Sequence, residues 1–355
     1  MWRASSVKSR GAHVISLRRQ RACSSRVPSS NMMNAPKNDG HLGAMFHQNL
    51  DLLAKFLDTS SVRGGVDFHL HSTFSDGAKT PYEIVENVIE NGLKAFALTD
   101  HDTMAGIEEV VDVMRCLSLS TTGENNEEPF NCLPVFVPGI EFSVMQDDSE
   151  IHILGYFTEY DPPGLSAYIE DQAKSRERRN MAMLEKLRSL GYDVRLDNLL
   201  CYGDEHTLPG RVHMALWLVE HGFCRSVTHA FEELLGVGKP AFVPRTRRSI
   251  RETCREIARA GGLSVIAHPQ QYGWTKNPES PSTREKLCER IAQLVEEGLN
   301  GIECFHGMAT PQEQRLLADV ALELGLIRTA GSDCHGRPDH HAPMYDRHTS
   351  FAHLI

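Results

Sequence analysis

Histidine, aspartate and glutamate residues stand at or near the C-terminal ends of almost every segment that the sequence predicts to be a β-strand. The predicted strands are short and apolar or alternate in polarity, and predicted helices lie between most of them. Such alternation predicts an α/β fold with a mostly parallel sheet that closes, or nearly closes, into a barrel. The predicted strands are 66–70, 94–100, 133–138, 150–157, 263–267, 301–305 and 327–330.

The ionisable residues at these strand ends are expected to meet at one edge of the sheet. His69 and His71 are two residues apart in an extended segment, so their rings point the same way, and Asp333 and His335 repeat this spacing after the last strand. The carboxyl ends of parallel strands share the edge where α/β enzymes build their active sites. The candidates at this edge are His69, His71, Asp76, Asp100, His101, Glu141, His152, His268, Glu303, Asp333 and His335.

So many imidazoles and carboxylates in one place predict a metal centre. Their joint burial costs free energy that cations can offset. Imidazole and carboxylate ligands without a thiolate cluster favour Zn²⁺, Mn²⁺ or Fe²⁺ over a cysteine-type structural zinc site. Because the candidates outnumber the ligands of one structural site, roughly two or three ions are expected.

Composition excludes several other classes of protein. The formal net charge of −10 argues against non-specific coating of long nucleic acid, which needs a basic surface. No apolar window is long enough for a membrane span. The nine cysteines include no CxxC pair and are odd in number, which favours reduced thiols in an intracellular compartment over a disulfide scaffold.

The first 38 residues differ in character from the rest of the chain. They contain no Asp or Glu, and their eight serines are interleaved with basic residues such as Arg3 and Arg26. An Arg- and Ser-rich, acid-free segment resembles an organellar, most typically mitochondrial, transit peptide. The alternatives are a disordered basic tail or a misassigned start codon, and without targeting the protein is expected in the cytoplasm.

A helical insertion is expected to interrupt the barrel and to recognise the substrate. Residues 165–190 read as one long charged helix, in which Arg176 and Arg179 share a face and can point their guanidinium groups together. Arginine binds phosphate oxygens in a forked arrangement, and Arg211, Lys239 and Arg245 are further candidates. The alternative is a solvated, charged helix face. The predicted division is 1–38 extension, 62–159 first barrel part, 160–246 insertion, 247–338 second barrel part and 339–355 irregular tail.

An ordered set of motifs resembles the PHP (polymerase and histidinol phosphatase) superfamily. The motifs DFHLHSTFSDG, ALTDHDT, PGIEFS, HILGY, IAHP and GSDCHG follow one another over 66–157 and 262–336. The resemblance implies a distorted (β/α)₇ barrel of the PHP type with a small helical insertion and a trinuclear metal site. The insertion, with RxxRN at 176–180 and later GRVH and GKPAFVPR, is similar to that of the bacterial 3′,5′-nucleoside bisphosphate phosphatases. That subgroup includes RNase AM, which also trims short RNA from the 5′ end.

The resemblance also implies which residues hold each ion. His69, His71 and Asp333 would hold the first, and Glu141 would bridge to a second held by His152 and His268. Asp76, His101 and His335 would hold the third, with Mn²⁺ favoured and Zn²⁺ or Fe²⁺ as alternatives. Asp100 and Glu303 are expected to orient ligands without binding an ion. The expected catalytic residues are Glu141, His101 and His268, with the general acid left open among His101, His268 and a metal-bound water.

The expected activity is metal-dependent hydrolysis of phosphate esters. Clustered divalent ions generate a hydroxide near neutral pH and neutralise charge on the phosphoryl group. The sequence contains no GxSxG, P-loop or GxGxxG that would indicate another chemistry. The expected substrates are 3′,5′-nucleoside bisphosphates or the 5′ ends of short RNA, and neither long duplex nucleic acid nor a membrane is an expected partner. The alternatives are a phosphatase for another small phosphomonoester, such as histidinol phosphate, and an inactive PHP scaffold.

Overall fold

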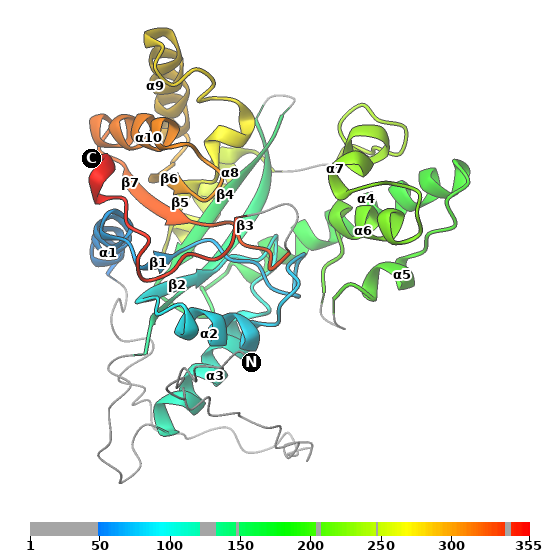
Figure 1. Ribbon diagram of the computed structural model, residues 1–355, viewed down its shortest axis with the longest axis horizontal. Coiled ribbons are helices and arrows are strands. Elements are labelled where there is room, and N and C mark those ends of the chain that lie inside the picture. The colour runs from blue at the N-terminus through cyan, green and yellow to red at the C-terminus, as the bar shows by residue number, and fades with distance from the viewer. Residues whose placement is uncertain (1–48, 121–132, 147–148, 204–206, 246–247, 338–341) are drawn as a thin grey trace, which may run out of the picture. The chain divides into compact units, whose positions relative to one another are not determined.

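The computed structural model describes residues 49–120, 133–146, 149–203, 207–245, 248–337 and 342–355 (Figure 1). The basic extension at 1–38, with its predicted targeting role, lies outside the described residues, as does most of the predicted loop at 119–131. Among the helices that are described, every one is too short or too polar to span a lipid bilayer.

Seven strands among the described residues form one sheet whose spatial order follows the chain. Neighbouring strands run parallel except around β4, which is antiparallel to both β3 and β5. The predicted mostly parallel α/β barrel is therefore confirmed, with one reversed strand where β3 and β4 are joined directly. The strands are β1 Val66–Asp67, β2 Ala95–Leu98, β3 Val135–Gln146, β4 Ser149–Phe157, β5 Gly262–Ile266, β6 Gly301–His306 and β7 Ile327–Gly331.

The first and last strands meet and nearly close the barrel. The backbone after β1 pairs with the end of β7 and with the residues after it, because Phe68 N donates to Ala330 O at 2.9 Å and His71 N donates to Cys334 O at 3.1 Å. Asp333 N donates to His69 O at 3.0 Å in the same seam. This closure brings the segment that carries His69 and His71 beside the segment that carries Asp333 and His335.

Helices surround the sheet (Figure 1). Three of them begin with a capping box, in which a Ser or Thr and the Glu three residues later exchange hydrogen bonds with the backbone: Thr80–Glu83, Ser249–Glu252 and Thr310–Glu313. The sequence reading assigned no helix before β1, where α1 packs against β7. The helices around the barrel are α1 Leu50–Arg63, α2 Pro81–Glu90, α3 Ile107–Ser120, α8 Ile250–Arg259, α9 Pro281–Glu296 and α10 Pro311–Glu323.

The main hydrophobic core lies within the barrel and between its strands and helices. Its largest fully buried side chain is Tyr156 on β4, whose hydroxyl donates to Phe68 O at 2.9 Å. Because a buried phenol needs a hydrogen-bond partner, this contact fixes the ring across the barrel. Cys304 on β6 belongs to the same core.

The insertion between β4 and β5 is helical and has its own hydrophobic cluster. Its helices are α4 Ser166–Ser189, α5 Leu196–Leu200, α6 Arg211–Glu220 and α7 Val227–Ala230, followed by a π-helical turn at Phe231–Leu235. Leu184, Trp217 and Leu235 are among the buried residues of this cluster, which is separate from the barrel core. The boundaries of the insertion as a domain stay a prediction.

The end of the chain packs onto the barrel with little regular structure. The Phe351 ring stacks on Phe305 at 4.7 Å, and Tyr345 N donates to the buried Asp67 carboxylate at 3.0 Å. A short 3₁₀ helix, Ala352–Leu354, follows. Aromatic side chains therefore attach residues 342–355 even though no periodic pattern marks them.

Candidate metal centre

The strand ends bring the predicted ligands into one buried group. His69 and His71 follow β1, His101 follows β2, Glu141 lies on β3 and His152 lies on β4. Among the later strands, His268 follows β5, and Asp333 and His335 follow β7, while Asp76 comes from the loop before α2. Most of these side chains are less than one-tenth exposed.

Four ligand atoms near the barrel seam have separations that suit one ion. His69 Nε2 lies 3.1 Å from His71 Nε2, 3.4 Å from Glu141 Oε2 and 3.4 Å from Asp333 Oδ1. His71 Nε2 lies 3.2 Å from Glu141 Oε2 and 3.3 Å from Asp333 Oδ1. Ligands about 2.1 Å from a tetrahedral ion lie roughly 3.4 Å from one another. The four atoms therefore outline a cage of the right size.

The two oxygens of Glu141 face different groups of imidazoles. Glu141 Oε2 lies in the group with His69, His71 and Asp333. The other oxygen, Oε1, lies 2.9 Å from His152 Nδ1 and 3.0 Å from His268 Nε2. Those two nitrogens are 3.3 Å apart. A carboxylate with one oxygen in each of two ligand groups can bridge two ions.

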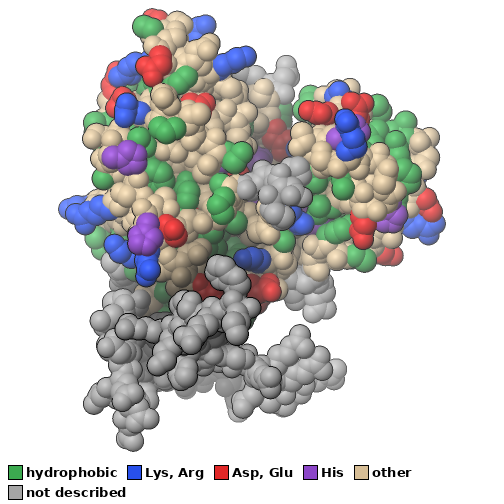
Figure 2. Space-filling view, viewed as in Figure 1, with side chains coloured by type: hydrophobic (Ala, Val, Ile, Leu, Met, Phe, Trp, Pro, Cys, Tyr) green, Lys and Arg blue, Asp and Glu red, His purple; other side chains and the backbone are tan. Residues whose placement is uncertain are grey.

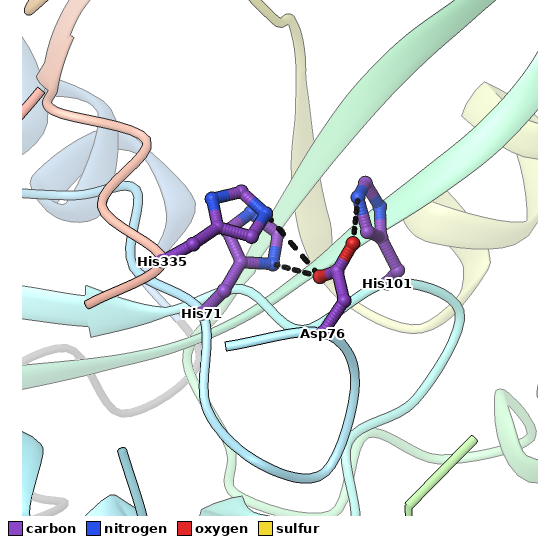
Figure 3. Close-up of side chains that lie close together, drawn as sticks. All are labelled: His71, Asp76, His101 and His335. Carbon is purple, nitrogen blue, oxygen red and sulfur yellow. Dashed lines mark ion pairs between the residues drawn. The ribbon is translucent and has the colours of Figure 1, made fainter. Parts of the chain in front are cut away.

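A third group gathers around Asp76 (Figure 3). Its Oδ1 lies 3.2 Å from His335 Nε2 and 3.8 Å from His71 Nδ1, and its Oδ2 lies 3.8 Å from His101 Nε2. His101 also reaches back to the centre, since its Nδ1 lies 2.9 Å from Glu141 Oε2. The side chains thus form three overlapping groups that could hold metal ions.

The electrostatics of the group favour cations. Burial by itself raises the pKa of Glu141, but the surrounding histidines hold it well below its usual range. Burial also raises the pKa values of Asp76 and Asp333, but neighbouring histidines hold both of them well below their usual range. Burial by itself lowers the pKa of His71, but Asp333 and Glu141 raise it to about 10. The carboxylates therefore remain ionised and require positive charge close to them.

Buried ligand atoms that lie close to one another without an aligned hydrogen bond also fit metal binding. They include Asp76 Oδ1, Glu141 Oε2 and His101 Nδ1. An unpaired buried polar atom costs about 1–3 kcal/mol, and a coordinated cation would remove that cost. The donor set of imidazole and carboxylate suits Mn²⁺, Zn²⁺ or Fe²⁺ and offers no thiolate.

Two further carboxylates contact the ligands or their loops. Glu303 Oε1 lies 2.8 Å from His69 Nδ1, and its Oε2 accepts a hydrogen bond from His268 N at 2.7 Å. Asp100 accepts hydrogen bonds from Ser72 Oγ and Ser75 Oγ, both at 2.6 Å. These contacts can fix the orientation of the His69 ring and the path of the loop that carries Asp76.

The sequence reading missed His306, which also faces the centre. Its Nε2 lies 3.5 Å from Asp333 Oδ2, and the ring is fully buried. Strict alternation from Glu303 would turn residue 306 to the opposite face of β6. A register shift between Glu303 and Phe305 instead brings both side chains to the same side. The sequence GIECFH contains no signal for this irregularity.

Unusual backbone conformations cluster at the same place. Asp102, His268 and Asp333 have φ values of 55°, 32° and 57°, in the left-handed region that non-glycine residues rarely adopt. Such conformations are maintained where surrounding contacts over-determine them, often at functional sites. Gly331 is required by close packing, because a Cβ there would lie 2.3 Å from His69 Cβ and 2.5 Å from Glu303 Oε1.

Arg176 and Arg245, two of the predicted phosphate-binding residues, contact a protein carboxylate. Arg176 Nε donates to Asp102 Oδ2 at 3.1 Å, and Arg245 Nη1 donates to the same oxygen at 2.7 Å. Asp102 Oδ1 accepts from Ser143 N at 3.2 Å, and all three charged side chains are buried. The two arginines therefore join the insertion to the strand that carries Glu141.

The other candidate cations have different surroundings. Arg179 is buried, and its Nε donates to Asn180 Oδ1 at 3.0 Å. Lys239 is exposed and does not line the cleft beside the metal centre. Arg211 does line that cleft; its Nη2 donates to Glu150 Oε2 at 2.8 Å, and its guanidinium carbon lies 5.5 Å from the centre of the Phe231 ring.

The cleft has a volume of about 730 Å³ and reaches the proposed ligands His152 and His268. Its walls come from the β3–β4 hairpin, the insertion and the segments after β5. The wall residues that carry polar or aromatic groups include Gln146, Glu150, Arg211, Phe231, Tyr272, Trp274 and Arg290. A small polar ligand with an aromatic part could therefore lie beside the metal centre.

Charged side chains of both signs are interspersed on the face shown in Figure 2. The described residues on this face form no continuous basic band.

Comparisons with known proteins point to one family. The model of the family described as "PHP domain" matches residues 67–304. A 5′-3′ exoribonuclease from Haemophilus influenzae is 30% identical over 269 residues, which are 76% of this chain and 89% of that protein. A 3′,5′-nucleoside bisphosphate phosphatase from Chromobacterium violaceum is 28% identical over 76% of this chain and 87% of its own length.

A solved structure shares the fold. The structure of a candidate metal-dependent phosphoesterase from Bifidobacterium adolescentis superimposes with a TM-score of 0.64 at 26% sequence identity. The match covers 79% of this chain and 92% of that one. The seven-stranded α/β fold is therefore one that this chain shares with that protein.

Proposed function

The chain belongs to the PHP domain family and is a metal-dependent phosphoesterase, and from this premise we propose that it hydrolyses 3′,5′-nucleoside bisphosphates or releases nucleotides from the 5′ ends of short RNA. The observation that supports this most directly is the cleft whose wall includes the proposed ligands His152 and His268 together with Arg211 and the aromatic rings of Phe231 and Trp274. The names of the Haemophilus and Chromobacterium relatives point to the same substrate class.

The proposed ligands divide among the ions as follows. His69, His71 and Asp333 would hold one ion, His152 and His268 would hold a second, and Glu141 would contribute one oxygen to each. Asp76, His101 and His335 would hold the third. Divalent ions bound there supply Lewis acidity, which lowers the pKa of an attacking water and offsets charge on the phosphate oxygens. Mn²⁺ suits this ligand set, and Zn²⁺ or Fe²⁺ are alternatives.

Neighbouring side chains would keep the ligands in a reactive arrangement. Glu303, 2.8 Å from His69 Nδ1, can hold the proton on that nitrogen and leave Nε2 free for an ion. His268 Nε2 lies 3.0 Å from Glu141 Oε1, and if this nitrogen binds an ion, the proton of the neutral ring would be on Nδ1. Burial lowers the pKa of both His101 and His268, which favours their neutral, coordinating forms. His101, His268 and a bound water remain the candidates for the general acid.

The cleft would recognise the rest of the substrate. Arg211 already forms one ion pair, with Glu150, and can turn a second edge of its guanidinium toward a phosphate. The Phe231 and Trp274 rings offer surfaces for a nucleobase, and Trp274 is itself covered by Arg290 at 4.7 Å. A substrate with two phosphates would thus present one to the metal centre and the other to the insertion.

Turnover by the metal-reconstituted protein tests this proposal. Adenosine 3′,5′-bisphosphate, a 5′-phosphorylated oligoribonucleotide, histidinol phosphate and an aryl phosphate would be compared, with inorganic phosphate and mononucleotide both measured. We expect kcat/KM to be highest for the bisphosphate or the oligoribonucleotide and activity to disappear with a chelator. Preferential hydrolysis of histidinol phosphate would refute the substrate assignment, and absence of all turnover would indicate a scaffold.

A further inference from the structure

His213, in the first turn of α6, has a buried nitrogen that the fold does not use. The side chain is fully buried, and its Nδ1 accepts a hydrogen bond from Gly210 N at 3.0 Å. A backbone N–H can only donate, so Nδ1 carries the lone pair and the proton of the neutral ring is on Nε2. This Nε2–H has no hydrogen-bond partner among the described residues.

The electrostatic environment of His213 includes residues of the third ligand group. The charges of Asp76, Arg337, Arg176 and His335 influence the pKa of its ring, and two of these residues are proposed ligands. Burial lowers the pKa of His213 to about 4, so the ring is a neutral donor at pH 7. A buried donor without a partner is costly, which suggests that a ligand supplies the acceptor.

The segment before α6 is attached to the loop that carries Asp76. Leu208 N donates to Phe74 O at 3.0 Å, and Thr207 Oγ1 donates to Thr73 O at 2.5 Å. Asn180 Nδ2 reaches Pro209 O at 2.7 Å from α4. These contacts attach the segment before α6 to α4 and to the loop that carries Asp76. The N-terminus of α6 is thereby held close to a loop that supplies a proposed metal ligand.

One arginine lies at this helix end and a second lies against the loop that carries Asp76. Arg176 approaches it so closely that a Cβ at Gly210 would lie 3.0 Å from Arg176 Nη1. Arg337 donates from Nη2 to Asp76 O at 2.9 Å, which puts its guanidinium next to the ligand loop. A helix N-terminus already favours anions, and the arginines add positive charge.

We propose that the N-terminal turn of α6, with His213, Arg176 and Arg337, binds the scissile phosphoryl group of the substrate beside Asp76 and His335. The inference rests on the proposed phosphoesterase function and assigns a part of its binding site. His213 Nε2–H donates to a phosphate oxygen, while the arginines balance its charge. The ring remains neutral and transfers no proton.

The alternative is that His213 only caps α6. It occupies the third helical position, where Glu or Gln caps a helix by accepting from the backbone N–H that Gly210 presents. Three substitutions separate these roles. His213→Gln keeps both the cap and a donor, His213→Glu keeps the cap but removes the donor, and His213→Leu removes both. His221→Leu, at the exposed C-terminal end of the same helix, is the matched control.

The experiment measures kcat/KM for adenosine 3′,5′-bisphosphate and inhibition by inorganic phosphate, in protein reconstituted with Mn²⁺ and assayed for metal content. A hydrogen bond to a charged group predicts a loss of about tenfold to 100-fold in kcat/KM for the Leu and Glu variants. Their inhibition constants for inorganic phosphate should rise by a similar factor, with metal content unchanged. The Gln variant and His221→Leu should stay within about threefold of the wild type.

Full activity of His213→Glu would overturn the proposal, because only a capping role tolerates that change. Unchanged phosphate inhibition in the Leu and Glu variants would overturn it as well, and so would a loss of metal in step with activity. Failure of the wild-type protein to hydrolyse any phosphate ester would refute the proposed function itself. If His213→Leu does not fold, the Glu and Gln pair decides the question.

Discussion

Replacement of Asp102 by Asn should destabilise the protein strongly, because one buried carboxylate balances two buried guanidinium groups. Arg176 Nε and Arg245 Nη1 donate to Oδ2 at 3.1 and 2.7 Å, and Ser143 N donates to Oδ1 at 3.2 Å. An Asn side chain has one acceptor oxygen. In either orientation its NH2 group would face an N–H donor, either the Ser143 N–H or the arginines. The negative charge that balances the arginines would also be lost.

The expected cost follows from the burial of the three groups. Removal of one partner from a buried ion pair typically costs about 3–5 kcal/mol, because the remaining charge is left uncompensated. We therefore expect the free energy of unfolding of Asp102→Asn to fall by about that amount. If Asp102→Leu is combined with Arg176→Met and Arg245→Met, most of the loss should be recovered, since apolar groups of similar size carry no desolvation cost.

Urea unfolding followed by circular dichroism, with a chelator present, would measure these differences. Asp171→Asn is the matched control, because Asp171 pairs with Arg248 at 2.8 Å on the surface, where the two side chains are 48% and 44% exposed. An exposed pair contributes about 0–1 kcal/mol. Equal, small effects of Asp102→Asn and Asp171→Asn would refute the reasoning.

Three further results are expected. Glu141→Gln should abolish turnover and lower the bound metal, because both oxygens of this carboxylate face ligand groups; retained turnover would contradict its bridging role. Arg211→Ala should raise KM for a bisphosphate at least fivefold, about 1 kcal/mol, and leave an aryl phosphate little changed, with Arg259→Ala as the surface control; equal effects on both substrates would place Arg211 in the catalytic machinery. Tyr156→Phe should lower the free energy of unfolding by about 1 kcal/mol through loss of its hydrogen bond to Phe68 O; an unchanged urea midpoint would show that this bond adds nothing.

The sequence predicted the features that depend on periodicity and on strand ends. The alternation in VDFHL and the apolar run LSVIA predict strands because the side chains of barrel strands are buried on defined faces. The position of His69, Asp333 and Glu141 relative to those strands was enough to predict that they meet. Their roles as ligands stay predictions, although the distances among them suit ions.

Other features depend on long-range contacts that one sequence does not reveal. Asp102 follows a predicted ligand, but its partners Arg176 and Arg245 come from segments more than 70 residues away. His306 faces the centre because of an irregularity in β6. His213 lies in the GRVH segment that contributes to the family resemblance, but its proposed role becomes visible only from its burial and its unpaired Nε2.

Anomalous diffraction from crystals grown with Mn²⁺ tests the central claim most directly. The account predicts several anomalous peaks per chain, one of them enclosed by His69 Nε2, His71 Nε2, Glu141 Oε2 and Asp333 Oδ1 at about 2.0–2.3 Å from each. A second peak should lie beside Glu141 Oε1, and a third beside Asp76. Crystals that show no peak among these side chains would contradict the claim that the strand ends share metal ions.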